Sequence, residues 1–353
     1  MTNAITMNNT TAPIITNANR IVTRPNANVI TSVEQYSSIL PTSSWEANNW
    51  DNRTLPWEGL ENGKDVSHNL STDVVFNLAG LNFGFEVVEL FDPYGNKIPM
   101  IGVLRDDNHF FLGSGTKRFT PLGNERTREL CDILHSLGFG YENAGVFDGG
   151  KVTYVSMKWK GSVASGEEMN YYVVIVNSFD GSKPFGVFIT PVRVWCKNTL
   201  ALAIKKAKRF WKLRHTTNAH IRLEEVKEAL NYFDLYINGL ETEISTMKLL
   251  TINDNKVKSF INTLFPIEAE ATGRVLAGVE RKRAELLYRY QYAPDLQDME
   301  HSAFRFINAV SDFVDHSEPA RRTASWRENR FANNLGGSEI LDVAYKIVQD
   351  EMI

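Results

Sequence analysis

Two aspartates and a histidine near the end of the chain have a spacing that suits a divalent cation. In "DFVDH", Asp312 and Asp315 fall on one face of a helix, and Asp312 meets His316 one turn later. Carboxylate oxygens are ligands that Mg²⁺ and Mn²⁺ prefer, so a metal-dependent nuclease is one hypothesis. Surface helix ends often have the same composition, and "YAPDLQDMEHS" (292–302) has a simpler explanation as a capped, solvated loop. We therefore predict no metal site.

Other signatures of catalysis are weak. "GSGTK" (113–117) lacks the GxxxxGK[ST] spacing of a phosphate loop, and no GxGxxG or HExxH motif and no Ser/His/Asp triad signature is found. Cys196 lies close to Arg193 and Lys197, which would lower its pKa, but its place at a predicted strand-to-helix junction favours burial. We expect no catalytic residue and no cofactor, and a protein without enzymatic activity is the favoured interpretation.

Positive charge is the most prominent chemical feature of the chain. Ten of the 38 Lys and Arg residues lie between Gly181 and Leu223, where there is no Asp or Glu, and the other 28 are outnumbered by 42 acids. This segment therefore carries a net charge near +10, and the rest of the chain one near −14. Such segregation predicts an anionic partner.

We expect residues 200–212 of this segment to form an amphipathic helix. At 100° per residue, its apolar residues, Phe210 and Trp211 among them, form a stripe roughly 120° wide that would pack on a sheet. The opposite face carries only cations, whose repulsion costs a few tenths of a kcal/mol per pair: Lys205, Lys208, Arg209 and Lys212. A face that contacts only water would usually include Glu, although a merely solvated face stays open as an interpretation.

Phosphate groups of a nucleic acid would supply the missing negative charge. The predicted contacts are Arg193, Lys197, Lys205, Lys208, Arg209, Lys212 and Arg214. Lys and Arg bind phosphates without reading the base sequence, so this binding would be non-specific and strongly salt-dependent. Four aromatic residues of predicted strands would offer stacking surfaces to unpaired bases, although strand aromatics usually belong to the core: Tyr154, Trp159, Tyr171 and Tyr172. An acidic protein surface is the alternative partner.

The elements that hold this segment follow an α+β pattern. Residues 1–54, rich in Asn and Thr, are expected to form a flexible arm. Residues 55–222 would form an α+β core, with a helix over 71–79, three strands within 82–115, a helix over 124–138 and two hairpins before the basic helix. Residues 223–353 show helical periodicity throughout. The predicted fold is an antiparallel β-rich N-terminal part with a packed helix, followed by a largely helical C-terminal part.

The composition also bears on the cellular compartment. Cys131 and Cys196 lack the CxxC spacing, and two buried free thiols are the simplest interpretation. There is no apolar run of eighteen residues, and the N-terminus lacks the basic and apolar regions of a secretory signal. We therefore expect a cytoplasmic protein that does not bind a membrane.

Several stretches resemble a known family. "LPWEGLENG", "VLRDDNHFFLGSGTKRFTPLGNE", "TPVRVWCKNTLALA" with "LRHT" after it, and "AFRFINAVSDFVDH" are similar to the phage/plasmid-like protein family built on domain of unknown function 932. The resemblance covers roughly residues 55–350. It implies a protein of a mobile element in a bacterial cytoplasm, and it implies no catalytic residues. Phe119 departs from the family pattern, where we expect Tyr.

The order of the elements is also similar to the layout of single-strand-annealing recombination proteins. Those proteins form rings that hold single-stranded DNA in a basic groove between sheet and helix, which implies a homo-oligomer here; a shared layout does not fix a function. The leading prediction is a phage- or plasmid-type DNA-binding protein that holds single-stranded DNA non-specifically in recombination, annealing or replication. The alternative is an anti-defence or host-takeover protein that binds an acidic host protein.

Overall fold

The computed structural model describes the chain in several stretches: 13–16, 20–23, 55, 57, 60, 63–164, 166–193, 210–215, 233–317, 323, 326, 329–331 and 338–352. For 13–16, 20–23, 160–164 and Arg193 the description covers the backbone only. Two of these stretches, β1 (Pro13–Thr16) and β2 (Arg20–Thr23), pair as an antiparallel hairpin within the segment predicted to be an arm.

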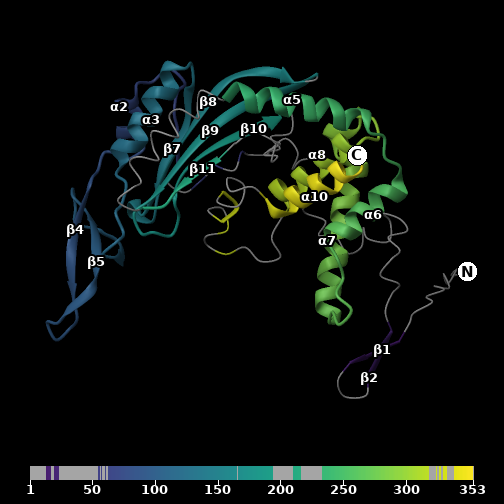
Figure 1. The fold of residues 1–353 in the computed structure, drawn as a ribbon, viewed down its shortest axis with the longest axis horizontal. Coiled ribbons are helices and arrows are strands. Elements are labelled where there is room, and N and C mark those ends of the chain that lie inside the picture. Colours follow the sequence, from purple (N-terminus) through teal and green to yellow (C-terminus); the bar gives the residue numbers. More distant parts are fainter. Residues whose placement is uncertain are drawn as a thin grey trace, which may run out of the picture.

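A six-stranded antiparallel sheet forms the centre of the β-rich part, with the strand order β11-β10-β9-β8-β7-β3 (Figure 1). Its strands are β3 (Gly63–Asp65), β7 (Gly140–Phe147), β8 (Val152–Ala164), β9 (Glu167–Ser178), β10 (Phe185–Arg193) and β11 (Phe210–Leu213). The predicted hairpin turns are confirmed. Gly149 and Gly150, between β7 and β8, have φ angles of 70° and 108°, which favour glycine because it has no Cβ.

A three-stranded antiparallel sheet extends from one end of the larger sheet (Figure 1). It consists of β4 (Phe85–Phe91), β5 (Lys97–Arg105) and β6 (Phe111–Thr116), as the sequence predicts. Most of "GSGTK" (113–117) lies in β6 and pairs with β5, so the stretch has a structural explanation as part of a strand. A Cβ on Gly113 would lie 2.5 Å from the Cα of Asp180, which accounts for a small residue at that close approach.

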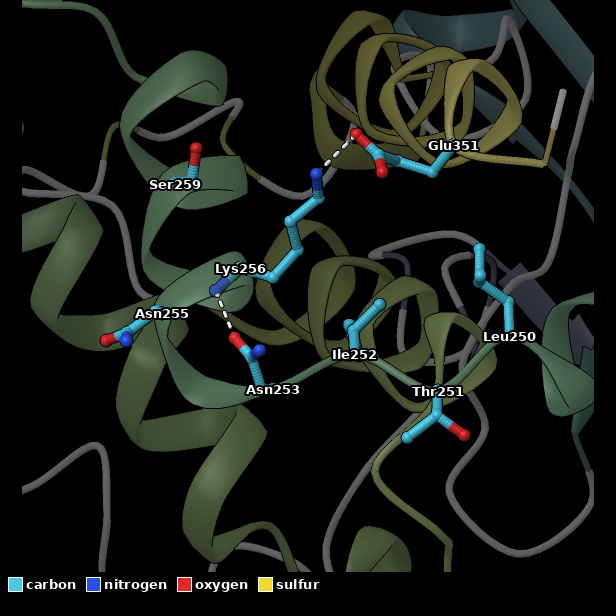
Figure 2. A pocket seen from close by; sticks show the side chains of 8 residues that line it. All are labelled: Leu250, Thr251, Ile252, Asn253, Asn255, Lys256, Ser259 and Glu351. Atoms are coloured by element: carbon cyan, nitrogen blue, oxygen red, sulfur yellow. Dashed lines mark hydrogen bonds and ion pairs between the residues drawn. The ribbon is translucent and has the colours of Figure 1, made fainter.

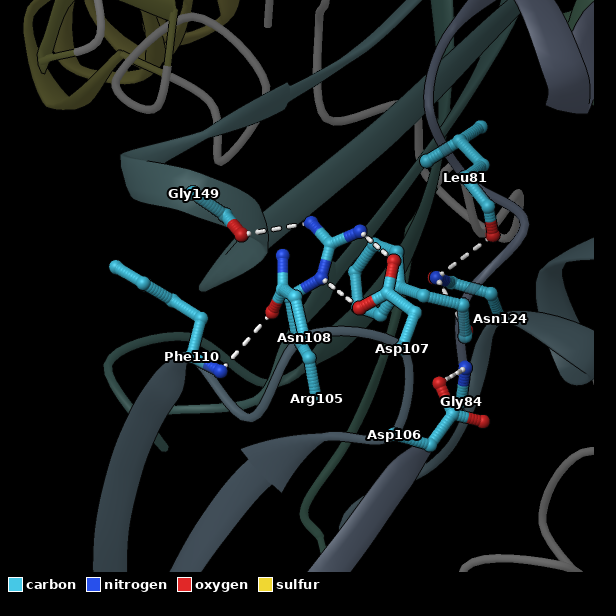
Figure 3. A network of polar contacts seen from close by, with 10 residues as sticks. Leu81, Gly84, Arg105, Asp106, Asp107, Asn108, Phe110, Asn124 and Gly149 are labelled. Atoms are coloured by element: carbon cyan, nitrogen blue, oxygen red, sulfur yellow. Dashed lines mark hydrogen bonds and ion pairs between the residues drawn. The ribbon is translucent and has the colours of Figure 1, made fainter.

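Arg105 joins the small sheet to the large one (Figure 3). Its guanidinium donates to both oxygens of Asp107, at 2.8 and 2.6 Å, and to the carbonyl oxygen of Gly149 at 2.9 Å. The same guanidinium lies 3.9 Å from the ring centroid of Phe83, in a cation–π contact. Nearby, Asn124 donates to the carbonyl oxygens of Leu81 and Phe83. These bonds fix the β4–β6 sheet against the turn between β7 and β8.

The two faces of the large sheet are covered differently. One face packs on α2 (Thr72–Leu78), α3 (Asn124–Ser136) and α5 (Phe233–Leu249), and its buried residues belong to a core that continues into the C-terminal helices. The other face is covered by a smaller cluster that includes Trp57 and Phe331, from segments far apart in the sequence. Both faces are buried over much of the sheet, as the apolar runs in β9 and β10 indicate.

The C-terminal part is helical, as predicted. After α5 come α6 (Asp254–Leu264), α7 (Gly273–Tyr292), α8 (Ala303–His316) and α10 (Glu339–Asp350), at the opposite end of the molecule from the β4–β6 sheet (Figure 1). Side chains of Asn253, Ser302 and Ser338 accept hydrogen bonds from backbone N–H groups in the first turns of α6, α8 and α10. No described helix has both the length and the apolar composition that a membrane span requires.

A buried charge network joins α7 to α8. Arg289 forms ion pairs with Asp312 and, at 3.0 Å, with Glu285, and Ser317 donates to Glu285 at 2.5 Å. Asp312 is completely buried. A buried ion pair is costly to break from one side, because the remaining charge is left without its partner in a medium of low dielectric constant. Asp312 therefore has a clear structural role.

We predict that Asp312→Asn lowers the free energy of unfolding by about 3 to 5 kcal/mol, because it removes the charge of one carboxylate that pairs with the buried Arg289. Urea denaturation of wild type and variant measures this difference. Asp298→Asn, at an exposed position of the preceding loop, is the matched control and should change stability by less than about 0.5 kcal/mol. Equal stability of Asp312→Asn and wild type would contradict the role given to the network.

Candidate nucleic-acid interface

The end of the predicted basic helix is a strand and not a helix. Residues Phe210–Leu213 form β11, which pairs antiparallel with β10 in the register Val187↔Trp211 and Phe188↔Phe210. The prediction of a helix over residues 200–212 was therefore wrong for Phe210, Trp211 and Lys212. Strand geometry replaces the 3.6-residue period with a period of two. β10 supplies the backbone partners that make the strand favourable.

The predicted helix placed Phe210 and Trp211 on one apolar stripe, whereas the strand places them on opposite faces of the sheet. Trp211 and Leu213 are buried in the main core, while Phe210 is 37% exposed and Lys212 is exposed on the other face. The prediction that Trp211 belongs to the core is confirmed, and the same prediction for Phe210 was wrong. The edge of the sheet thus presents an aromatic ring and an ammonium group side by side.

Lys212 lies over aromatic rings and not beside a carboxylate. Its Nζ is 5.1 Å from the ring centroid of Phe210 and 5.9 Å from that of Phe188. Among the described residues, no carboxylate forms an ion pair with Lys183, Lys212 or Arg214. Lys212 and Arg214 are exposed, so the charge of this strand is available to a partner.

His215 fastens the end of β11 to two other segments. Its Nδ1 accepts a hydrogen bond from the backbone N–H of Leu122 at 3.3 Å, and its Nε2 lies 3.2 Å from the carbonyl oxygen of Lys183, to which it donates when the ring is neutral. The backbone N–H of Thr120 donates to the carbonyl oxygen of His215 at 3.1 Å. The ring packs edge-on against Phe119 at 5.5 Å between centroids. His215 therefore joins three chain segments.

Most of the other predicted contact residues lie outside the described residues. These are Lys197, Lys205, Lys208 and Arg209, while for Arg193 only the backbone, at the end of β10, is described. Cys196 also lies outside the described residues. Cys131 is buried, as predicted, and burial raises the pKa of its thiol well above the ordinary value, so it is held in the unreactive thiol form.

The expected aromatic stacking surfaces on the hairpin strands are not available. Tyr154, Tyr171 and Tyr172 are at most 2% exposed, and Trp159 packs edge-on against Tyr171 and Phe233. These side chains stabilise the two core clusters. Phe210 is an exposed aromatic residue of the basic segment that sequence reasoning missed, and the alternation in "FWKL" is the signal that points to it.

Within the part of the chain that the structure describes, the acidic residues of α8 are not gathered into a candidate metal site. Asp312 is engaged by Arg289, and no group of three or more His, Cys, Asp or Glu residues within the described stretches could hold a metal ion. Asp312, the main proposed ligand of a nuclease centred on Asp312, Asp315 and His316, is therefore already paired within the protein.

An open pocket of about 410 Å³ lies between α6 and α10, and Figure 2 shows the residues that line it. Lys256 pairs there with Glu351 at 2.6 Å. Because its two charged lining residues neutralise each other, this pocket offers no net charge to an anion.

Two further exposed cations lie on a chain segment that contacts His215, and the sequence analysis did not single them out. Lys117 and Arg118 are exposed immediately before the Phe119–Leu122 segment that meets His215. They lie outside the acid-free stretch that begins at Gly181, so charge counting along the chain could not connect them with it.

Comparison with known proteins identifies one family. The family model described as "Domain of unknown function (DUF932)" matches residues 111–334, which include β6 to β11 and the helices through α8. No curated protein and no solved structure matches the chain significantly.

We predict a pH dependence of stability from His215. Its pKa is lowered, chiefly because burial disfavours the charged ring, although the Lys183 carbonyl and the Asp180 carboxylate act in the opposite direction. The neutral ring therefore stabilises the fold in full above the unfolded-state pKa of about 6.5, and this stabilisation is lost as the pH falls from there through the lower folded-state pKa.

Urea denaturation between about pH 8 and pH 5 tests this prediction, since that window spans the ordinary pKa of histidine. The decrease in unfolding free energy towards low pH should be smaller in His215→Gln than in wild type. His68→Gln, at an exposed position, is the control and should retain the wild-type decrease. Parallel curves for wild type and His215→Gln would exclude a buried neutral imidazole.

Proposed function

Since the chain belongs to the DUF932 family, whose description assigns no activity, we propose a function from the chemistry of its surface: non-specific binding of single-stranded DNA. The observation that carries the proposal is the exposed pair of cations on and beside β11, Lys212 and Arg214, which have no ion-pair partner among the described residues. A phosphodiester backbone supplies regularly spaced negative charges, and its binding releases counterions.

The phenyl ring of Phe210 favours a single strand over a duplex. The ring is partly exposed and lies next to the Lys212 ammonium group, so one base can stack on it while a neighbouring phosphate meets the cation. In a duplex the faces of the bases are covered by their neighbours. The contacts proposed here are to phosphate groups and to the face of a base, and neither kind of contact reads the base sequence. Binding is therefore independent of sequence.

We further propose that the protein belongs to a phage or plasmid and works in the cytoplasm of the bacterial host. There it holds single strands during recombination, annealing or replication. Several copies bound along one strand would form a homo-oligomer, with a ring as one form. The residues around β11, including Lys205, Lys208 and Arg209 of the same basic segment, would line the path of the strand.

We predict that Lys212→Gln/Arg214→Gln weakens binding to a fluorescent single-stranded oligonucleotide. Each lost phosphate contact lowers the slope of log affinity against log salt concentration by about 0.7, so the double variant should lose about 1.4. Fluorescence anisotropy at several salt concentrations measures both affinity and slope. Arg274 is exposed in the first turn of α7, outside the basic segment, and Arg274→Gln should behave as wild type.

Absence of binding by wild type at low salt would overturn the proposal, and so would equal slopes for wild type and the double variant. A charge reversal to Glu at Lys205, Lys208, Arg209 and Lys212 should abolish binding. If the pure protein does not bind DNA, and nuclease-treated extracts of infected cells yield a stable protein partner, the alternative of a host-takeover protein with an acidic partner is favoured.

We also predict that Phe210→Ala lowers affinity for single-stranded DNA by about 5- to 150-fold, since stacking of one base contributes about 1 to 3 kcal/mol. The slope against salt should stay unchanged, because a stacking contact releases no counterion. Phe210→Tyr, which keeps the ring, is the matched control and should bind as wild type. A Phe210→Ala variant with unchanged affinity would exclude stacking at this position.

A further inference from the structure

We propose that the nucleic-acid surface continues from β11 onto a second cationic site, formed by Lys117, Arg118 and Lys183, which binds the phosphodiester backbone of the same strand. The inference rests on the proposed function. It extends the binding surface to Lys117 and Arg118, which lie outside the basic segment, and to Lys183, which lies at its start. Its basis is the junction at His215, where three chain segments meet.

The first step is the placement of these segments. The segment after β6 reaches His215 through Thr120 and Leu122, whose N–H groups donate to the His215 carbonyl oxygen and Nδ1. The turn between β9 and β10 reaches it through the Lys183 carbonyl oxygen, 3.2 Å from Nε2. Arg214 directly precedes His215 in the chain. Three chain segments therefore meet at the buried ring of His215, and together they carry four cations: Lys117, Arg118, Lys183 and Arg214.

The second step concerns the exposure of the cations. The N–H group of Phe119 donates to the carbonyl oxygen of Thr116 at 2.8 Å, which closes a turn with Lys117 and Arg118 at its two central positions. Both side chains are exposed. Phe119 anchors this turn, because its ring packs on Gly115, where a Cβ would come within 2.7 Å of it. The turn thus presents two positive charges from a fixed base.

The third step is electrostatic. Within the described residues, Lys117, Arg118 and Lys183 form no ion pair. Asp180, the acid nearest to Lys183 in sequence, uses its Oδ1 to accept from the Ser178 hydroxyl at 2.9 Å and the Ser182 N–H at 2.8 Å. Its carboxylate stabilises the turn, and the cations around it still outnumber it. A net positive charge remains at the junction.

The fourth step is the order of the charges. Lys212 and Arg214 are two residues apart along an extended chain, a separation of about 6.6 Å at 3.3 Å per residue. This is comparable to the step between neighbouring phosphates of an extended strand. Beyond Arg214 the His215 junction places the 117–118 turn and Lys183 next in line. A single strand that stacks on Phe210 and follows Lys212 and Arg214 thus meets further cations.

The salt dependence of single-strand binding tests the inference. Between 50 and 200 mM salt, each contact at a slope of about 0.7 accounts for roughly a 2.6-fold loss of affinity. Lys117→Gln/Arg118→Gln should reduce the slope by about 1.4, so that its loss of affinity over this range is about sevenfold smaller than that of wild type. Lys183→Gln should reduce the slope by about 0.7. Arg274→Gln is the matched control and should keep the wild-type slope.

The outcomes separate this inference from the proposed function. If Lys212→Gln/Arg214→Gln lowers the slope but Lys117→Gln/Arg118→Gln and Lys183→Gln do not, the second site is overturned and the proposed function stands. If wild type does not bind, both are overturned. All substituted side chains are exposed or half-buried, so unfolding curves should match that of wild type. A double variant that is destabilised is replaced by the single variants Lys117→Gln and Arg118→Gln, each of which should lower the slope by about 0.7. Lys117→Arg and Arg118→Lys keep the charge and serve as controls that should keep the slope.

Discussion

The pairing of β11 with β10 determines what the edge of the large sheet offers to a partner. Its register places Trp211 and Leu213 in the core and leaves Phe210 and Lys212 outside. Burial of a large aromatic side chain contributes a few kcal/mol, so the inner residues hold the strand while the outer ones need no packing partner. A slip of one residue would bury Lys212 and expose Trp211, so stability and surface charge depend on the same register.

Two sets of arginines among the described residues differ in how their charge is satisfied. Arg283, Arg289 and Arg305 are buried. Arg289 pairs with carboxylates, while Arg283 donates to the carbonyl oxygen of Phe265 after α6 and Arg305 to that of Tyr290 near the end of α7. In these cases the protein itself satisfies the charge. Arg118 and Arg214 are exposed and form no ion pair within the described residues. This contrast supports an external partner for the second group.

Much of the fold could be predicted from the sequence, because turn residues and apolar periodicity mark its strands and helices locally. Residues 210–213 could not, because four residues of "FWKL" fit a helical stripe as well as a strand, and the deciding partner is β10. The His215 junction was also hidden, since Leu122 and His215 lie 93 residues apart. The domain boundary near residue 222 and the contacts of Lys197, Lys205, Lys208 and Arg209 stay predictions.

The central claim is that cations around β11, which have no counter-charge among the described residues, meet a nucleic acid. Photo-crosslinking of a single-stranded oligonucleotide that contains halogenated uracil, followed by mass spectrometry of the digested protein, tests it most directly. The account predicts adducts on peptides that contain Phe210 to Arg214. Adducts confined to helices α6 to α10, or no adduct at low salt, would contradict it.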